Sequence, residues 1–140
     1  MSPKIIRIAE VAIVVSNLER SKRFYSDVLG LKEFHHPSIT PDRGVTFYLT
    51  DGLRGLLGLW LPGKWKEVNP HITGTAGDIG GKAHVVLHID NSEGEAALAN
   101  LRKHGVKLWG PRYNEKGEIH IDFEDPDGHM LEYWGIVKEE

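Results

Sequence analysis

Three ionisable side chains fall in stretches that are otherwise apolar. Glu132 lies within residues 130–134, and Glu10 lies in a similar stretch near the N-terminus. A carboxylate in an apolar strand is costly unless it is paired, bound to a metal ion or turned outward. His84 opens a third apolar stretch, in which His88 shares its face because strand side chains alternate. A histidine at a strand end is more often a simple hydrogen-bonding residue, so each position has a structural as well as a chemical explanation.

The absence of cysteine restricts what these residues can do. The 140 residues contain no cysteine, which excludes disulfides, thiolate metal sites and a cysteine nucleophile. Any metal ion must be held by histidine, carboxylate or backbone oxygen. An oxygen-rich set of this kind is compatible with Mn, Mg, Ni, Co, Zn or Fe and selects none of them.

A second group of polar residues follows from strand alternation. A strand over residues 118–124 places His120, Asp122 and Glu124 on one face and apolar side chains on the other. We interpret His120 and Asp122 as substrate-binding or proton-transfer groups, the alternative being a solvated strand face. One histidine and two indoles are further candidates for the wall of a substrate pocket, although the indoles are equally typical of a core: His88, Trp60 and Trp134. Four histidines beside turns are expected at the surface: His35, His36, His71 and His129.

These candidates must be positioned by two similar halves of the chain. Hydrophobic patterning predicts a strand, a helix and three strands in the first half, at residues 8–15, 18–29, 32–36, 45–50 and 56–61. Ser16 and Asn17 are candidate N-caps of that helix. The second half repeats the order, with a strand at 84–89, a helix capped at Asn91–Ser92 and ended by Gly105, and strands at 106–109, 118–124 and 130–136.

The ends of the two halves superpose with a shift of 74 residues, whereas the helices between them fit only with a one-residue slip. Glu10 falls on His84 and Gly58 falls on Glu132, since 84 − 10 and 132 − 58 are both 74. Two similar modules in one domain normally place equivalent positions around a pseudo-twofold axis. These four residues therefore form a set that deserves to be considered together.

The length fits a single domain made of both modules. Domains commonly have about 100–150 residues, so we predict one domain over residues 1–140, with modules at 5–62 and 82–137. The connecting residues 63–81 show no periodicity and are predicted to be a lid or a mobile linker.

Composition excludes several classes of protein. The chain is 26% charged and 40% hydrophobic, as in soluble globular proteins, and 17 basic and 20 acidic residues give a net charge of −3. The sequence has no basic stripe of the kind that would indicate nucleic-acid binding. No apolar run approaches the roughly 20 residues that span a membrane, and the N-terminus lacks the apolar core of a signal peptide. We therefore expect a cytoplasmic protein.

Four segments carry a resemblance to a known family: VVSNLERSKRFYSDVLGL at 14–31, HVVLHID at 84–90, FEDPDG at 123–128 and HMLE at 129–132. They resemble the vicinal oxygen chelate superfamily, which includes glyoxalase I, methylmalonyl-CoA epimerase, extradiol dioxygenases, fosfomycin-resistance transferases and bleomycin-resistance proteins. The resemblance implies an α+β fold in which two βαβββ modules form a curved mixed-sheet cup. Its motifs are specific for the superfamily and not for an activity within it.

The resemblance also implies a metal site. His84 and Glu132 match ligand positions of the second module, and Glu10 falls where many members have histidine. Gly58 falls where members with four ligands have a carboxylate or amide, so this ligand is missing. The set Glu10, His84 and Glu132 leaves open positions for water and a bidentate substrate, and Glu132 or Glu10 is the expected general base.

The sequence is compatible with several functions. The leading hypothesis is a metal-dependent lyase or isomerase of the glyoxalase type, acting on a small substrate with two adjacent oxygens. The alternatives are an extradiol-type dioxygenase, a metal-free drug-binding protein of the bleomycin-resistance type and, without a residue that singles it out, an antibiotic thiol transferase. By analogy with other single-domain members we expect a homodimer with a small-molecule substrate and no nucleic-acid or membrane partner.

Overall fold

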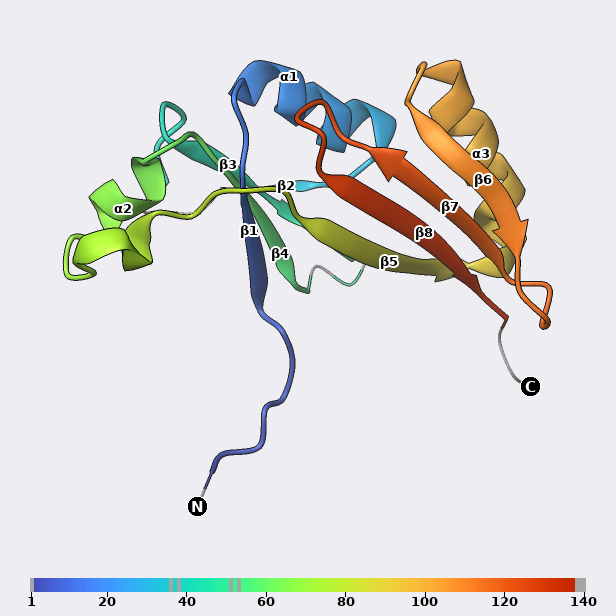
Figure 1. Cartoon of the computed structure of the whole chain (residues 1–140), viewed down its shortest axis with the longest axis horizontal. Helices are drawn as coiled ribbons and strands as arrows, with labels where there is room; N and C mark the ends of the chain where they lie inside the picture. Colours follow the sequence, from blue (N-terminus) through green and yellow to red (C-terminus); the bar gives the residue numbers. More distant parts are fainter. Residues whose placement is uncertain (1, 36, 38, 51, 53, 138–140) are drawn as a thin grey trace. The chain divides into compact units, whose positions relative to one another are not determined.

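A computed structural model describes residues 2–35, 37, 39–50, 52 and 54–137. They fall into two compact units, Met1–Gly81 and Lys82–Glu140, called here the N-terminal and C-terminal units (Figure 1). No helix of the described residues is long and apolar enough to cross a membrane.

The N-terminal unit contains a four-stranded mixed sheet. Its elements are β1 (Glu10–Val14), α1 (Leu18–Arg23), a π-helical turn (Phe24–Val28), β2 (Glu33–Phe34), β3 (Gly44–Tyr48) and β4 (Leu56–Trp60). The strand order is β1-β4-β3-β2, with β1 parallel to β4 and the other pairs antiparallel. The helical segment begins at Asn17, as the sequence predicts, because the Asn17 side chain accepts a hydrogen bond of 3.0 Å from the Arg20 N–H.

The segment between the two sheets is partly helical. Residues 64–68 form α2 (Lys64–Val68), and a 3₁₀ turn follows at Gly74–Gly77. The Lys66 ammonium donates to the Gly74 carbonyl at 2.9 Å and lies 3.3 Å from the Asp78 carboxylate. The absence of hydrophobic periodicity in residues 63–81 did not reveal these short helical turns, because local hydrogen bonds hold them; the role of the segment as a lid or linker stays a prediction.

The C-terminal unit repeats the arrangement. It contains β5 (His84–Asp90), a 3₁₀ turn (Asn91–Glu93), α3 (Gly94–Lys103), β6 (Leu108–Tyr113), β7 (Ile119–Glu124) and β8 (Met130–Ile136). The strand order β5-β8-β7-β6 matches that of the first unit, again with one parallel pair. Val86 faces Glu132 here as Ala12 faces Gly58 in the N-terminal unit, which is the 74-residue shift seen in the sequence. The predicted α+β class with two βαβββ modules is confirmed.

Strand β6 is longer than its sequence suggests. The predicted end at Trp109 was wrong, because an irregularity between Trp109 and Arg112 lets the strand continue past Gly110 and Pro111. Pairing resumes with Arg112 opposite His120. The bulge therefore brings Arg112 onto the sheet face that carries the polar residues of β7.

The two faces of the C-terminal sheet differ in character. Alternate residues Ile119, Ile121 and Phe123 are buried together with Leu98 and Leu101 of α3. This packing assigns His120, Asp122 and Glu124 to the opposite face, as strand alternation predicts. The apolar face anchors the sheet, so that the polar face is left for the site.

Close contact between α3 and β7 depends on a glycine. A Cβ atom added at Gly94 would overlap Ile119 Cγ2, whereas one added at Gly80 would meet nothing within 4 Å. We predict that Gly94→Ala lowers the free energy of unfolding by about 1–3 kcal/mol through overpacking, measured by urea denaturation. The control Gly80→Ala should change it by less than about 0.5 kcal/mol; equal effects of both changes would contradict this packing.

Candidate metal and substrate site

Three potential metal ligands gather on adjacent strands of the C-terminal sheet. Asp122 on β7 is paired directly with Glu132 on β8, and Val86 on β5 is the partner of Glu132 on its other side. His84 precedes Val86 by two residues and so shares its face. One ligand atom from each of His84, Asp122 and Glu132 lies within 4.8 Å of the other two.

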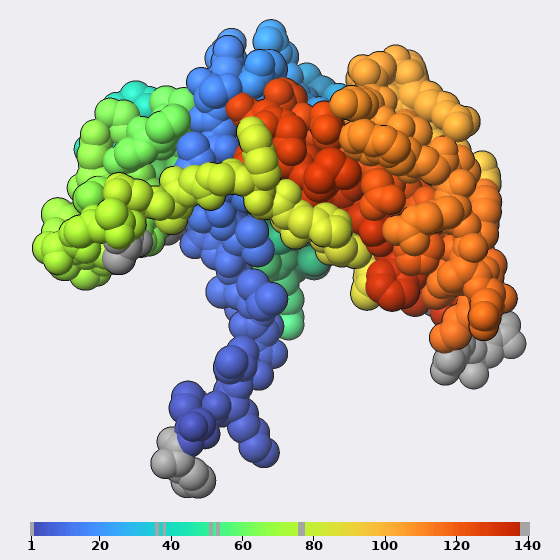
Figure 2. Space-filling view, viewed as in Figure 1, coloured from blue at the N-terminus to red at the C-terminus, as the bar shows by residue number. Residues whose placement is uncertain are grey.

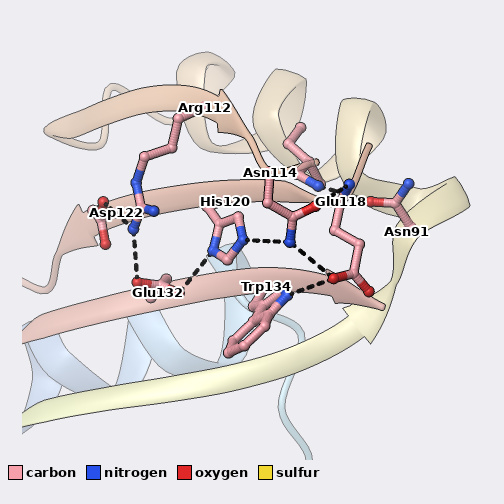
Figure 3. Close-up of polar contacts among 9 residues, drawn as sticks. Asn91, Arg112, Asn114, Glu118, His120, Asp122, Glu132 and Trp134 are labelled. Atoms are coloured by element: carbon pink, nitrogen blue, oxygen red, sulfur yellow. Dashed lines mark hydrogen bonds and ion pairs between the residues drawn. The ribbon is translucent and has the colours of Figure 1, made fainter. Parts of the chain in front are cut away.

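The carboxylate of Glu132 is buried and has partners on both oxygens. The residue is 7% exposed. Arg112 Nη2 donates to Oε1 at 3.3 Å, and His120 Nδ1 lies 3.2 Å from Oε2 (Figure 3). The same Arg112 nitrogen lies 3.5 Å from Asp122 Oδ2. The guanidinium thus offsets part of the negative charge of two carboxylates that stand opposite each other.

A hydrogen-bond network continues from His120 along β7. Asn114 Nδ2 lies 3.4 Å from His120 Nε2 and donates to Glu118 Oε1 at 2.9 Å. The Trp134 indole N–H reaches the same Glu118 oxygen at 3.4 Å, and the Val137 N–H donates to Glu118 Oε2 at 3.0 Å. The Asn114 side chain, followed by the Val137 backbone, holds the pKa of Glu118 below its ordinary value. Glu118 is therefore the anionic end of the network.

The aromatic part of the site lies beside this network. The Trp134 ring contacts His120 at a centroid distance of 4.9 Å and His88 at 5.1 Å. Trp134 and both histidines are thus neighbours on the polar face of the C-terminal sheet, where the sequence places its candidate pocket wall. Their role in binding a substrate stays a prediction.

The structure combines the predicted residues in a different way from the sequence analysis. His84 and Glu132 come together. Their third partner within the unit is Asp122, for which the sequence predicts a role in substrate binding or proton transfer. Three contributors were missed: Arg112, Asn114 and Glu118. The register of the last hairpin was the available signal for Asp122, because a tight turn at 125–128 places it opposite Glu132.

The N-terminal candidates form a separate arrangement around Gly58. A Cβ atom at Gly58 would lie 2.8 Å from Glu10 Oε1 and 3.0 Å from Trp60 Nε1. The Glu10 carboxylate and the Trp60 indole therefore occupy the space that a side chain at position 58 would need. Trp60 is buried, as a core or pocket-wall indole would be. The part that Glu10 plays as a ligand stays a prediction.

The histidines beside turns divide into two kinds. His35 and His71 are exposed, and His36 lies outside the described residues. His129 is only 2% exposed, so the expectation of a surface residue was wrong. Its Nδ1 accepts a hydrogen bond of 2.9 Å from the Ala83 N–H, which ties the last hairpin to the start of β5.

A cavity of about 380 Å³ in the N-terminal unit is lined by none of the predicted metal ligands or substrate-binding residues. It is bounded by α1, β2 and β3, with Leu18, Phe34 and Val45 among its apolar lining. Lys22 and Glu33 form an ion pair of 3.2 Å in its wall. This cavity is therefore separate from the candidate metal site of the C-terminal unit.

The donor atoms of the C-terminal group fit a divalent cation. One imidazole nitrogen and two carboxylates form a mixed set that suits Mn, Zn and similar ions. The set contains a single histidine, unlike the two-histidine, one-carboxylate set of Fe(II) oxygenases.

Comparison with known proteins gives the family of the chain. Residues 7–133 match the model of the Glyoxalase/Bleomycin resistance protein/Dioxygenase superfamily, and the chain belongs to this superfamily. Among similar solved structures is the integron cassette protein HFX_CASS4 from the mobile metagenome of Halifax Harbour Sewage Outfall, with 26% identity, a TM-score of 0.70 and coverage of 94% of this chain and 100% of the other.

Two further structures share the fold at lower identity. Lactoylglutathione lyase from Agrobacterium tumefaciens is 20% identical with a TM-score of 0.73, over 95% of this chain and 96% of the other. TnmS3, an antibiotic binding protein from Streptomyces sp. CB03234, is 21% identical with a TM-score of 0.69, over 96% and 98%. One fold thus supports an enzyme and a binding protein.

The lowered pKa of Glu118 gives a pH-dependent prediction. A carboxyl whose pKa is lower in the folded than in the unfolded state stabilises the fold above its unfolded pKa. That stabilisation is lost as the pH falls through the folded value. Glu118→Gln should therefore be less stable than the parent protein at pH 7, and the difference should shrink below about pH 4, measured by thermal melting across pH. Glu115→Gln, on the exposed turn, is the control; a difference for Glu118→Gln that is the same at every pH would contradict this assignment.

Proposed function

We propose that the protein is a metal-dependent enzyme of the glyoxalase type, a lyase or isomerase acting on a small substrate with two adjacent oxygen atoms. The observation that carries the proposal is the convergence of His84, Asp122 and Glu132, with one ligand atom from each within 4.8 Å of the others. Membership of the superfamily supports the same reading.

Each residue of the proposed metal site would have a distinct role. His84, Asp122 and Glu132 would hold the ion, with Glu10 as a further candidate ligand. A bound divalent cation supplies Lewis-acid stabilisation of negative charge on substrate oxygen. Glu132 is the proposed general base, or Glu10 in its place, because a carboxylate next to the substrate can take up a proton and return it.

The neighbours of Glu132 suit this role. Its Oε2 is occupied by His120 at 3.2 Å, so the carboxylate is held in one orientation. Trp134 packs against His120, the partner of Glu132, and against His88, and the rings of Trp134 and His88 would form a wall for the substrate. Low exposure of Glu132 keeps water from competing for the proton.

Metal binding is the first test. We expect the purified protein to bind Mn²⁺, and His84→Ala combined with Glu132→Ala to weaken binding by at least about 100-fold, since it removes two of three ligands. Isothermal titration calorimetry measures the affinity.

The matched control for the metal test is His88→Ala, which changes the other exposed histidine on the same face of β5. It should leave Mn²⁺ affinity within about threefold of the parent. Equal affinity of the parent and the double variant would show that the assigned group is not the metal site.

A second candidate function, a metal-free binding protein, is favoured by Arg112. Its guanidinium already lies 3.3 Å from Glu132 and 3.5 Å from Asp122, so both carboxylates have a cationic partner without an ion. The fold shared with TnmS3, an antibiotic binding protein, is compatible with this reading.

Removal of Arg112 separates the two functions. Arg112→Met should raise Mn²⁺ affinity by about tenfold or more, because a positive charge about 3–4 Å from both carboxylates opposes a second cation. Arg102→Met removes an exposed cation of α3 and should leave the affinity unchanged. If the parent binds no Mn²⁺ while Arg112→Met does, the metal-free reading is supported; if the two bind equally, Arg112 does not compete with the ion.

Two further expectations from the sequence remain proposals with less support: a dioxygenase activity and a cytoplasmic homodimer. An extradiol-type dioxygenase needs a donor set with a second histidine, and the group of described residues contains one histidine. We also propose a cytoplasmic homodimer, by analogy with other members of the superfamily.

A further inference from the structure

Asn114 has a side-chain orientation that its own hydrogen bonds determine. It begins the turn between β6 and β7, where asparagine commonly accepts from backbone N–H groups ahead of it. Its Oδ1 accepts from the Lys116 N–H and from the Glu118 N–H, both at 3.0 Å. Backbone N–H groups only donate, so the amide oxygen must be on this side and the NH₂ group on the other.

The NH₂ group of Asn114 in turn determines the protonation pattern of His120. Nδ2 carries two hydrogens and accepts none. One is donated to Glu118 Oε1 at 2.9 Å, and the nearest partner for the other is His120 Nε2 at 3.4 Å. Nε2 can take part only as an acceptor, so the hydrogen of the neutral ring must be on Nδ1.

Nδ1 is the ring nitrogen that faces the proposed site. It lies 3.2 Å from Glu132 Oε2, so in this tautomer it donates to the carboxylate. In the other tautomer two lone pairs would face each other across this gap. Figure 3 shows the resulting chain from Glu118 through Asn114 and His120 to Glu132.

The ring itself has little freedom to escape this arrangement. His120 is 7% exposed and packs on Trp134 with an interplanar angle of 35°. Trp134 donates to the same Glu118 oxygen that binds Asn114. Glu118 therefore anchors both the amide that selects the tautomer and the indole that supports the ring.

We propose that Asn114 is a positioning residue, which selects the Nδ1–H tautomer of His120 and thereby holds Glu132 Oε2 with an N–H donor. The other carboxylate oxygen of Glu132, Oε1, is not held by His120 and lies on the side of Arg112. The consequence for metal binding rests on the proposed function, because outer partners of a ligand typically change affinity by about 10–100-fold.

The tautomer is tested first, in metal-free protein. Long-range ¹H–¹⁵N correlation spectra of the histidine rings should show His120 with a protonated Nδ1 and an unprotonated Nε2. Asn114→Asp places an acceptor where the donor was, so Nε2 should become protonated. A parent protein with the hydrogen on Nε2 overturns the proposal, whatever the protein does with metals.

Two variants of His120 keep the test independent of the stability of the Asn114 variant. His120→Asn retains an N–H donor near the place of Nδ1, and His120→Gln retains a polar group near the place of Nε2 instead. Both lose the packing on Trp134. We expect Mn²⁺ affinity within about threefold of the parent for His120→Asn, and a loss of about 10–100-fold for His120→Gln and Asn114→Asp.

The outcomes distinguish this inference from the proposed function. Equal affinities for His120→Asn and His120→Gln in a protein that binds Mn²⁺ overturn the positioning role. If the parent binds no Mn²⁺ but shows the Nδ1–H tautomer, and Asn114→Asp protonates Nε2, the metal-dependent function fails and the positioning of Glu132 stands.

Discussion

Two carboxylates stand opposite each other on one face of the C-terminal sheet, and the neighbouring contacts compensate for the repulsion between them. Asp122 is the direct cross-strand neighbour of Glu132, a relation in which like charges destabilise a sheet. Water screens the charge of Glu132 poorly because the residue is buried. A cation or an N–H donor must therefore approach the pair. Arg112 and His120 do so from β6 and β7, and the bulge in β6 is what brings Arg112 within reach.

The N-terminal unit shows the same framework without this constraint. There Thr46 is the cross-strand partner of Gly58, as Asp122 is of Glu132. Neither residue is charged, and the Trp60 indole and the Glu10 carboxylate crowd the space above the glycine. Figure 2 draws the N-terminal unit in blue to green and the C-terminal unit in yellow to red. The two units thus share a backbone arrangement but carry different side chains at equivalent positions.

Local signals in the sequence were sufficient for most of the fold. Strand β8 has the predicted bounds, residues 130–136, because its apolar run is interrupted only by the glutamate that marks the site. The side-chain cap at Asn17 likewise acts within a few residues. Longer-range features escaped. Arg112 follows a Gly-Pro pair that normally ends a strand, and α2 is too short to show a period. The sequence identifies Asp122 as a polar candidate. Its pairing with Glu132 depends on the register of the hairpin between β7 and β8, which alternation within a single strand does not define.

The two partners of Glu132 differ in how firmly they are held, and this difference bears on function. The His120 side chain is 9% exposed and is held through both ring nitrogens and one ring face. The Arg112 side chain is 59% exposed and reaches both carboxylates through a single nitrogen, Nη2. The exposed Arg112 side chain can be replaced by another cation from solvent, whereas His120 cannot leave without exposing a buried network. Exchange of Arg112 for another cation would therefore keep a positive charge beside Asp122 and Glu132 while Glu132 kept its orientation. A site that binds and releases a charged ligand needs this separation between a fixed carboxylate and a replaceable counter-charge.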